Sequence, residues 1–265
     1  MGKVILFAEY EELKNEIAKL RTEISMLVVE KDELVFVKCK NIEMTYMLAL
    51  GSLEYQAFQL ERNVLRLKRK TELIQAKLNR QEKADIEEIE ERLQMEFAEY
   101  QRMLDEKIDS MNAALERSRA TVLSEEETKE LKKLYRQIVK ALHPDLHKTQ
   151  SEAEKRLLFN AMLAYESGDL HGMRIIWEMI GGAVREDDEI SGLEQMKNEK
   201  KRLRDILNVL KERIAEIKTK YPYTLKEYIK DEETIEKHRL KLTQRISELQ
   251  EAVEVYQNKI EEMLR

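Results

Sequence analysis

The sequence predicts an all-α protein made mainly of long coiled-coil helices. Charged residues make up 38% of the 265 positions, and the chain holds only 7 Gly and 2 Pro. Glycine and proline are the residues that interrupt helices, and this charge content is typical of long solvated helices. Apolar residues also recur at alternating spacings of three and four, which indicates helical seams.

Residues 1–120 are expected to form an N-terminal region of long helices. The seam of the first helix comprises Tyr10, Leu13, Ile17, Leu20, Ile24, Leu27 and Leu34. Residues 35–39 are β-branched and aromatic and break this pattern, so we expect a buried connection there. A second helix should span about residues 42–81, and a third, capped by Asp85, about residues 86–119. Gly51 inside the second helix indicates either a close helix approach or a local kink.

The second helix contains a basic segment at residues 62–80. Its cationic residues are Arg62, Arg66, Lys68, Arg69, Lys70, Lys77 and Arg80. We expect a solvated face that pairs with acidic neighbours. The alternative is an anion-binding stripe with a nucleic-acid role. The net charge of −6 argues against a general nucleic-acid binder, so nucleic acid is not the expected partner.

Residues 121–183 are expected to form a smaller helical module. Ser124 and Glu127 have capping-box spacing at a helix start. Pro144 disfavours helical conformation in the residue before it, so this helix should end near Leu142. The inner faces comprise Leu131, Leu134, Ile138 and Leu142 on this helix and Leu157, Leu158, Met162 and Tyr165 on the next. Two antiparallel helices joined by a polar loop should pack through these faces, and a third should follow at residues 171–180.

The first helix of this module carries a local positive charge. Its cationic residues and those of the following loop are Lys129, Lys132, Lys133, Arg136, Lys140 and Lys148. Glu130 and Asp145 are the acidic residues in the same stretch, which leaves a net charge of +4. A basic patch on an acidic protein suits an acidic protein partner and would mainly set the association rate and its salt dependence. The alternative is an ordinary solvated helix face.

This arrangement resembles the J-domain of DnaJ-type co-chaperones. The resemblance is carried by Tyr135-Arg136, Lys140, His143-Pro144-Asp145, Ala153-Glu154 and Ala164-Tyr165-Glu166. The sequence before Ser124 shows no pattern for the short first helix of a J-domain. Leu146 follows the tripeptide at a position where a lysine is common. The resemblance therefore indicates a divergent J-domain-like module, with flanking coiled coils, that completes its core with neighbouring helices.

The resemblance implies a function and its residues. In that family the loop tripeptide and the basic helix before it dock on a DnaK-type chaperone and stimulate its ATP hydrolysis. Carried over to this chain, His143, Pro144 and Asp145 would form the trigger loop. The docking charges would be Arg136 and Lys140, with Lys132 and Lys133 in support. The predicted function is a J-domain-like co-chaperone or adaptor whose coiled coils present or select an unknown client protein.

The same loop also has features of a metal or catalytic site. His143, Asp145 and His147 are spaced His-x-Asp-x-His, and imidazole and carboxylate are ordinary metal ligands. The loop offers no clear fourth ligand, and no nucleophile, glycine-rich phosphate loop or known catalytic motif accompanies it. We therefore expect no metal, no cofactor and no enzymatic activity of the chain's own.

Residues 184–265 are expected to form a C-terminal antiparallel coiled-coil hairpin. A polar segment at residues 185–189 marks its boundary. Its seams comprise Leu203, Leu207, Leu210, Ile214, Ile217 and Tyr221, followed by Ile235, Leu242, Ile246, Leu249, Val253, Tyr256, Ile260 and Met263. Pro222 should end the first helix, and Thr224 with Glu227 has capping-box spacing for the second. The alternative is parallel dimerisation through the same stripes, which leaves a homo-oligomer open.

The composition indicates a soluble, cytoplasmic protein. Cys39 is the only cysteine, which excludes an internal disulfide and is consistent with a reducing compartment. No apolar run approaches the roughly 20 residues that a membrane span needs, so no membrane partner is expected. A second function stays open, namely a structural or scaffolding coiled-coil protein whose J-like module no longer couples to a chaperone.

Overall fold

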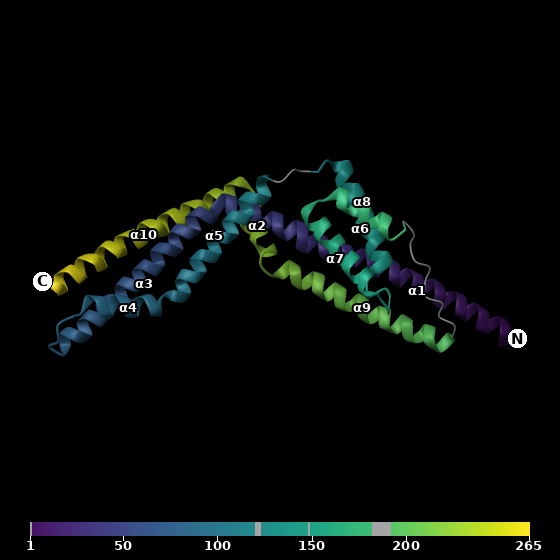
Figure 1. The fold of residues 1–265 in the computed structure, drawn as a ribbon, viewed down its shortest axis with the longest axis horizontal. Helices are drawn as coiled ribbons and strands as arrows, with labels where there is room; N and C mark the ends of the chain where they lie inside the picture. The colour runs from purple at the N-terminus through teal and green to yellow at the C-terminus, as the bar shows by residue number, and fades with distance from the viewer. Residues whose placement is uncertain (1, 120–122, 148, 182–191) are drawn as a thin grey trace. The chain divides into compact units, whose positions relative to one another are not determined.

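The protein is all-α in the computed structural model, which describes residues 2–119, 123–147, 149–181 and 192–265. Within these ranges the chain forms helices and connecting turns and no β-strand, which confirms the fold class (Figure 1). The chain divides into two compact units. The first comprises Met1–Lys40 and Thr121–Thr224, and the second comprises Asn41–Ala120 and Leu225–Arg265.

This division differs from the three consecutive domains that the sequence suggested. Each unit combines an N-terminal and a C-terminal segment, because helices far apart in the sequence pair with each other. The expected boundaries at 120/121 and 183/184 and the polar segment at residues 185–189 lie outside the described residues.

In the first unit, helix α1 (Gly2–Asp32) and helix α9 (Leu193–Thr219) lie side by side (Figure 1). Ion pairs join Glu9 to Lys197 at 2.8 Å, Glu23 to Lys211 at 2.9 Å and Glu30 to Lys218 at 3.1 Å. The residue numbers rise together on both helices, so the two helices run parallel. Helices α6 (Glu125–Leu142), α7 (Glu152–Ser167) and α8 (Leu170–Met179) complete this unit.

In the second unit, helix α3 (Ser52–Asn79) pairs with helix α10 (Glu232–Leu264). Arg245 contacts Glu61 at 3.0 Å, and the Arg239 side chain donates to the Ala49 carbonyl at 3.2 Å. The residue numbers again increase together along the two partners, so this pair of helices is parallel too. Helices α4 (Ile86–Glu96) and α5 (Ala98–Arg119) pack against the α3 side.

The expected antiparallel hairpin of residues 184–265 was therefore wrong. Helix α9 buries Leu203 and Leu207 in one core with Ile24 and Val28 of α1, so its seam is already occupied within the first unit. Helix α10 is occupied by α3 in the second unit. The capping box expected at residues 224–227 was also wrong. Those residues lie in a 3₁₀ helix, η3 (Tyr223–Tyr228), and α10 begins at Asp231, whose side chain accepts from the Thr234 N–H at 2.7 Å.

The helical conformation continues without a break from Gly2 to Asn79. The buried connection expected at residues 35–39 was wrong, because this stretch belongs to the π-helix η1 (Glu33–Cys39). The wider π turns absorb the change in apolar spacing without ending the helix. Helix α2 (Lys40–Tyr46) and a second π-helix, η2 (Met47–Gly51), lead into α3. A Cβ at Gly51 would lie 2.6 Å from the Met111 Cε of α5, so the glycine marks a close helix approach.

Local sequence signals located several of the other helix ends. The Asp85 side chain caps α4 by accepting from the N–H groups of Glu87 at 3.0 Å and Glu88 at 3.2 Å. The single helix expected at residues 86–119 is instead interrupted at Phe97, which separates α4 from α5. The basic segment of α3 pairs with acidic residues as expected, since Lys70 reaches Glu90 at 2.5 Å and Lys77 reaches Glu88 at 2.9 Å.

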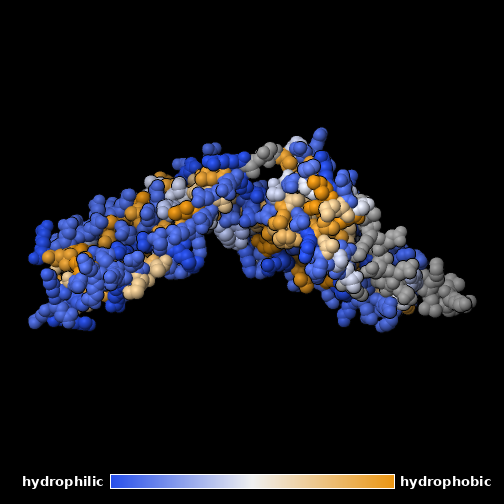
Figure 2. Space-filling model, in the orientation of Figure 1, coloured by the Kyte–Doolittle hydropathy of each residue, from blue (hydrophilic) through white to orange (hydrophobic). Residues whose placement is uncertain are grey.

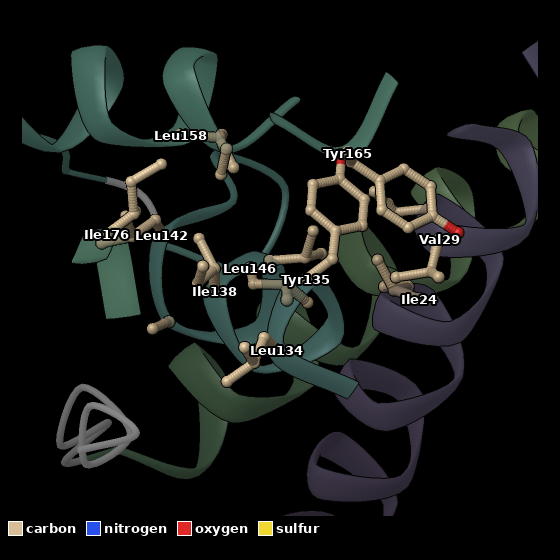
Figure 3. Packing of buried hydrophobic residues seen from close by; sticks show 14 of the residues in the cluster. Ile24, Val29, Leu134, Tyr135, Ile138, Leu142, Leu146, Leu158, Tyr165 and Ile176 are labelled. Carbon is tan, nitrogen blue, oxygen red and sulfur yellow. The ribbon is translucent and has the colours of Figure 1, made fainter. Parts of the chain in front are cut away.

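The main core of the first unit joins α6, α7 and α8 to α1 and α9. At its centre the rings of Tyr135 and Tyr165 stack, with centroids 4.3 Å apart and planes 8° apart. Figure 3 shows this stack beside Ile24 and Val29 of α1. Helix α1 thus supplies one wall of the core around α6 and α7.

Candidate functional site

The candidate site is the tripeptide His143-Pro144-Asp145, which follows α6 directly. Ser124 and Glu127 cap the start of α6 reciprocally, so the expected capping box is confirmed, and the helix ends at Leu142 as expected. His143 adopts an extended conformation at φ −71° and ψ 133°, the region to which a following proline confines its neighbour. The N–H groups of Leu146 and His147 then donate to the His143 carbonyl at 3.0 and 3.1 Å, which turns the chain back.

Two side chains bind this loop to the end of α6. The last carbonyls of a helix lack partners within the helix and need donors from elsewhere. The buried His147 ring approaches the Lys140 carbonyl with its Nε2 at 2.9 Å, and because a carbonyl only accepts, Nε2 carries the proton. Gln150 donates to the Leu142 carbonyl. Together with the buried Leu146, these bonds hold the loop against the core of the first unit.

Within the tripeptide, His143 and Asp145 contact each other. The Asp145 N–H donates to His143 Nδ1 at 3.2 Å, and Asp145 Oδ2 lies 3.7 Å from the same nitrogen. The His143 side chain is 15% exposed and that of Asp145 is 36% exposed, while Pro144 faces solvent. Burial lowers the pKa of the His143 imidazole, and Lys31 acts in the same direction against Asp145 and Asp32. His143 is therefore a neutral ring with its free proton on Nε2.

Four cations form a stripe on the solvent-facing side of α6. They are Lys129, Lys133, Arg136 and Lys140, and all four are exposed. Their spacing of four, three and four residues places them on one face of a helix. Lys129 lies 3.8 Å from Glu125, whereas the other three make no ion pair with the residues that the structure describes. We call this set the cationic stripe; it runs along α6 to the tripeptide.

Lys132 lies away from the cationic stripe. Its Nζ contacts Glu33 Oε1 of η1 at 2.9 Å, and Lys38 lies 3.6 Å from the same oxygen. Burial acts to raise the pKa of Glu33, but the two lysines outweigh it and hold the pKa below its usual value. Of the four sequence-predicted docking charges, Lys133, Arg136 and Lys140 thus share one free face, and Lys132 is engaged within the first unit. Lys148 lies outside the described residues.

The two stacked tyrosines differ in their polar contacts. Tyr135 Oη donates to Asp32 Oδ2 at 2.6 Å in a buried hydrogen bond, and Lys31 lies 3.0 Å from the other oxygen of that carboxylate. The Tyr165 hydroxyl is buried and has no hydrogen-bond partner among the described residues. Burial raises the pKa of both phenols, and the Asp32 charge raises that of Tyr135 further. The Tyr135–Asp32 bond fixes α6 to the end of α1.

Apolar side chains are exposed on the two helices that follow the tripeptide. Phe159 and Leu163 lie one turn apart on α7, and Ile175 and Met179 lie one turn apart on α8. Figure 2 shows apolar surface, in orange and tan, over the part of the first unit where α7 and α8 lie in Figure 1. The module therefore exposes both the cationic stripe and apolar side chains.

The metal site considered for this loop is not assembled within the described ranges. No group of three or more His, Cys, Asp or Glu residues there is placed to hold a metal ion, and the spacing of His143, Asp145 and His147 makes no such group. Within the same ranges, no helix is both long enough and apolar enough to cross a bilayer.

Sequence reasoning missed the residues that hold the tripeptide from other helices. Arg202 of α9 donates to the Asp145 carbonyl at 3.2 Å, and Glu199 fixes Arg202. Asp32 and Glu33 anchor α6 through Tyr135 and Lys132. No local pattern identifies such long-range partners. One local signal was available: Ser151 and Glu154 form a second capping box, at the start of α7, with the same spacing as Ser124 and Glu127.

A comparison of the chain with models of known families, with curated proteins and with solved structures finds no match.

Proposed function

We propose that the chain is a J-domain-like co-chaperone or adaptor that engages a DnaK-type chaperone and stimulates its ATP hydrolysis. The observation that carries the proposal is the placement of His143-Pro144-Asp145 at the end of the cationic stripe of α6. The tripeptide, the basic face before it and the partner helix α7 resemble the parts that a J-domain uses. In this proposal α1 takes the place of the short first helix, because it contacts α6 and shares one core with α6 and α7.

The docking charges of the proposal are Lys133, Arg136 and Lys140, with Lys129 at the far end of the stripe. Lys133, Arg136 and Lys140 make no ion pair with described residues, which leaves these three available to an acidic surface. Exposed charges act mainly on the association rate, and salt screens them over about 10 Å at 0.1 M. The interaction should therefore weaken as the salt concentration rises.

In this proposal the two parallel helix pairs bind the client protein. We interpret α1–α9 and α3–α10 as coiled coils that present or select a client protein. We propose that a homo-oligomer would use the outer faces of these helices, because α1 contacts α9 and α3 contacts α10 within the one chain described.

The test is steady-state ATP hydrolysis by a DnaK-type chaperone from the same organism. The wild-type protein should stimulate hydrolysis, and His143→Gln should abolish the stimulation while the helical circular dichroism stays unchanged. Arg136→Gln/Lys140→Gln should raise the concentration needed for half-maximal stimulation. Lys155→Gln/Arg156→Gln removes the same charge from the exposed surface of α7 and should have no such effect. Absence of stimulation by the wild-type protein would refute the proposal.

A second candidate is a scaffolding protein whose module serves only for packing. The observation that favours it is the partial enclosure of the tripeptide, since the His143 side chain is only 15% exposed and α9 contacts the loop. This candidate predicts that neither the wild-type protein nor His143→Gln changes ATP hydrolysis. It also predicts that substitutions in the cationic stripe leave partner binding unchanged.

A further inference from the structure

Arg202 of α9 reaches the tripeptide from outside the α6–α7 pair. Its Nη2 donates to the backbone carbonyl of Asp145 at 3.2 Å. In the part of the chain that the structure describes, no other helix provides a side chain that hydrogen-bonds to the tripeptide. Because α9 pairs with α1 over its length, this bond connects the loop to the α1–α9 pair.

Glu199 holds the Arg202 guanidinium in place. Arg202 donates through Nε to Oε2 at 3.0 Å and through Nη2 to Oε1 at 2.8 Å, and Arg21 of α1 lies 3.8 Å from Oε1. The Glu199 residue is only 2% exposed, and a buried carboxylate is costly unless cations compensate it. A two-point contact with a carboxylate also fixes the plane of a guanidinium. The contacts with Glu199 therefore orient the Arg202 guanidinium independently of its bond to the loop.

Asp145 is consequently held from both sides of its backbone. Its N–H donates to His143 Nδ1, and its C=O accepts from Arg202. The ring of Pro144 fixes its own backbone dihedral angle φ, at the position directly before Asp145. With both peptide groups of Asp145 held, the backbone of Pro144 and Asp145 is kept in one conformation.

We propose that Arg202 is a positioning residue through which the α1–α9 pair controls the conformation of the tripeptide loop. This rests on the proposed function, because the loop that Arg202 positions is the one that would dock on the chaperone. The contact from Arg21 to Glu199 and then to Arg202 crosses from α1 to α9 and ends at the loop. The Tyr135–Asp32 bond holds α6 to α1, so a partner that separates α9 from α1 would also move Arg202 away from the loop. The Asp145 carbonyl would then lose its donor, and a smaller fraction of the molecules could dock.

The test uses Arg202→Lys in the full chain, with Arg213→Lys as the matched control. A lysine keeps a positive charge beside Glu199, so the fold should persist, but its single nitrogen cannot hold both carboxylate oxygens and also reach the Asp145 carbonyl. Arg213 pairs with Glu216 three residues away on the exposed face of the same helix. We expect amide hydrogen exchange at Leu146 and His147 to become about tenfold faster in Arg202→Lys and to stay unchanged in Arg213→Lys.

The chaperone assay supplies the second readout. Arg202→Lys should raise the concentration for half-maximal stimulation about threefold or more and leave the maximal rate unchanged, because fewer molecules hold the competent loop. Unchanged exchange at both amides, or an unchanged half-maximal concentration where the wild-type protein stimulates, would overturn the inference. A wild-type protein that does not stimulate refutes the proposed function alone, and hydrogen exchange then decides whether Arg202 positions the loop.

Discussion

At the scale of single residues, the contrast between Tyr135 and Tyr165 shows how one buried hydroxyl organises the module. The rings stack on each other, but only the Tyr135 hydroxyl has a hydrogen-bond partner among the described residues. That partner, Asp32, belongs to α1, so the bond joins two segments that are far apart in the sequence. A buried carboxylate left without such a donor is costly, whereas a phenol without a partner loses little when it becomes phenylalanine.

We predict that Tyr135→Phe lowers the free energy of unfolding by about 1–3 kcal/mol. Tyr165→Phe, the matched control, should change it by less than about 1 kcal/mol, because its ring stays and its hydroxyl makes no bond with described residues. Urea denaturation of both variants, followed by circular dichroism, measures the difference. Equal losses in the two variants would mean that the Tyr135–Asp32 bond does not contribute.

His143 should make stability depend on pH. Burial lowers the pKa of its imidazole in the folded protein below the ordinary value of 6.5. Above pH 6.5 the ring is neutral in both folded and unfolded chains, and this contribution to stability is fully present. As the pH falls towards the folded pKa, His143 is protonated in the unfolded chain but still mostly neutral in the folded chain. Protonation therefore favours the unfolded chain, and this contribution to stability is lost as the pH falls through the folded pKa.

The prediction is that the free energy of unfolding falls more steeply between pH 7.5 and pH 5 in the wild-type protein than in His143→Gln. The glutamine cannot titrate, so the difference between the two profiles isolates this residue. Urea denaturation across the range measures it. Parallel profiles would show that His143 titrates alike in the folded and unfolded chains.

At the scale of helices, the sequence predicted several helix ends, but it did not predict which helices pair with each other. The Ser124–Glu127 capping box, the Asp85 cap and the helix end before Pro144 depend on residues within a few positions of one another. Which helix pairs with a heptad seam depends on the whole fold. The apolar residues of the different seams are similar, so they do not identify the partner. The α9 seam therefore predicted a helix pair correctly but gave no means to choose α1 over α10.

Charge exchange between α1 and α9 tests their parallel register. Glu23 and Lys211 face each other at 2.9 Å, and both are about half exposed. Glu23→Lys and Lys211→Glu should each lower the free energy of unfolding by about 0.2–1 kcal/mol, because like charges then meet on an exposed surface. The double exchange should recover most of the loss, and added salt should reduce both effects. A double variant with purely additive losses would contradict the pairing.

At the scale of the whole molecule, the two units matter because neither is a continuous piece of chain. The first unit needs residues 1–40 and 121–224, so the candidate site depends on segments at both ends of its sequence. The sequence pointed to the tripeptide, to Arg136 and to Lys140 because their spacing is local. The sequence did not predict Arg202 and Asp32, because their contacts form only when α9 packs against the tripeptide loop and α1 packs against α6.

Fragments of the chain distinguish a self-contained module from the two-unit arrangement. A chain of residues 121–183 lacks Asp32, Ile24 and Arg202, and at about 60 residues it would be marginal even with a complete core. We predict that this fragment lacks a cooperative unfolding transition, whereas residues 1–224 retain the near-ultraviolet circular dichroism of the packed tyrosines. The longer fragment should also keep the stimulation of ATP hydrolysis. A cooperatively folded 121–183 fragment with full stimulation would instead mean that α1 and α9 contribute nothing that the site requires.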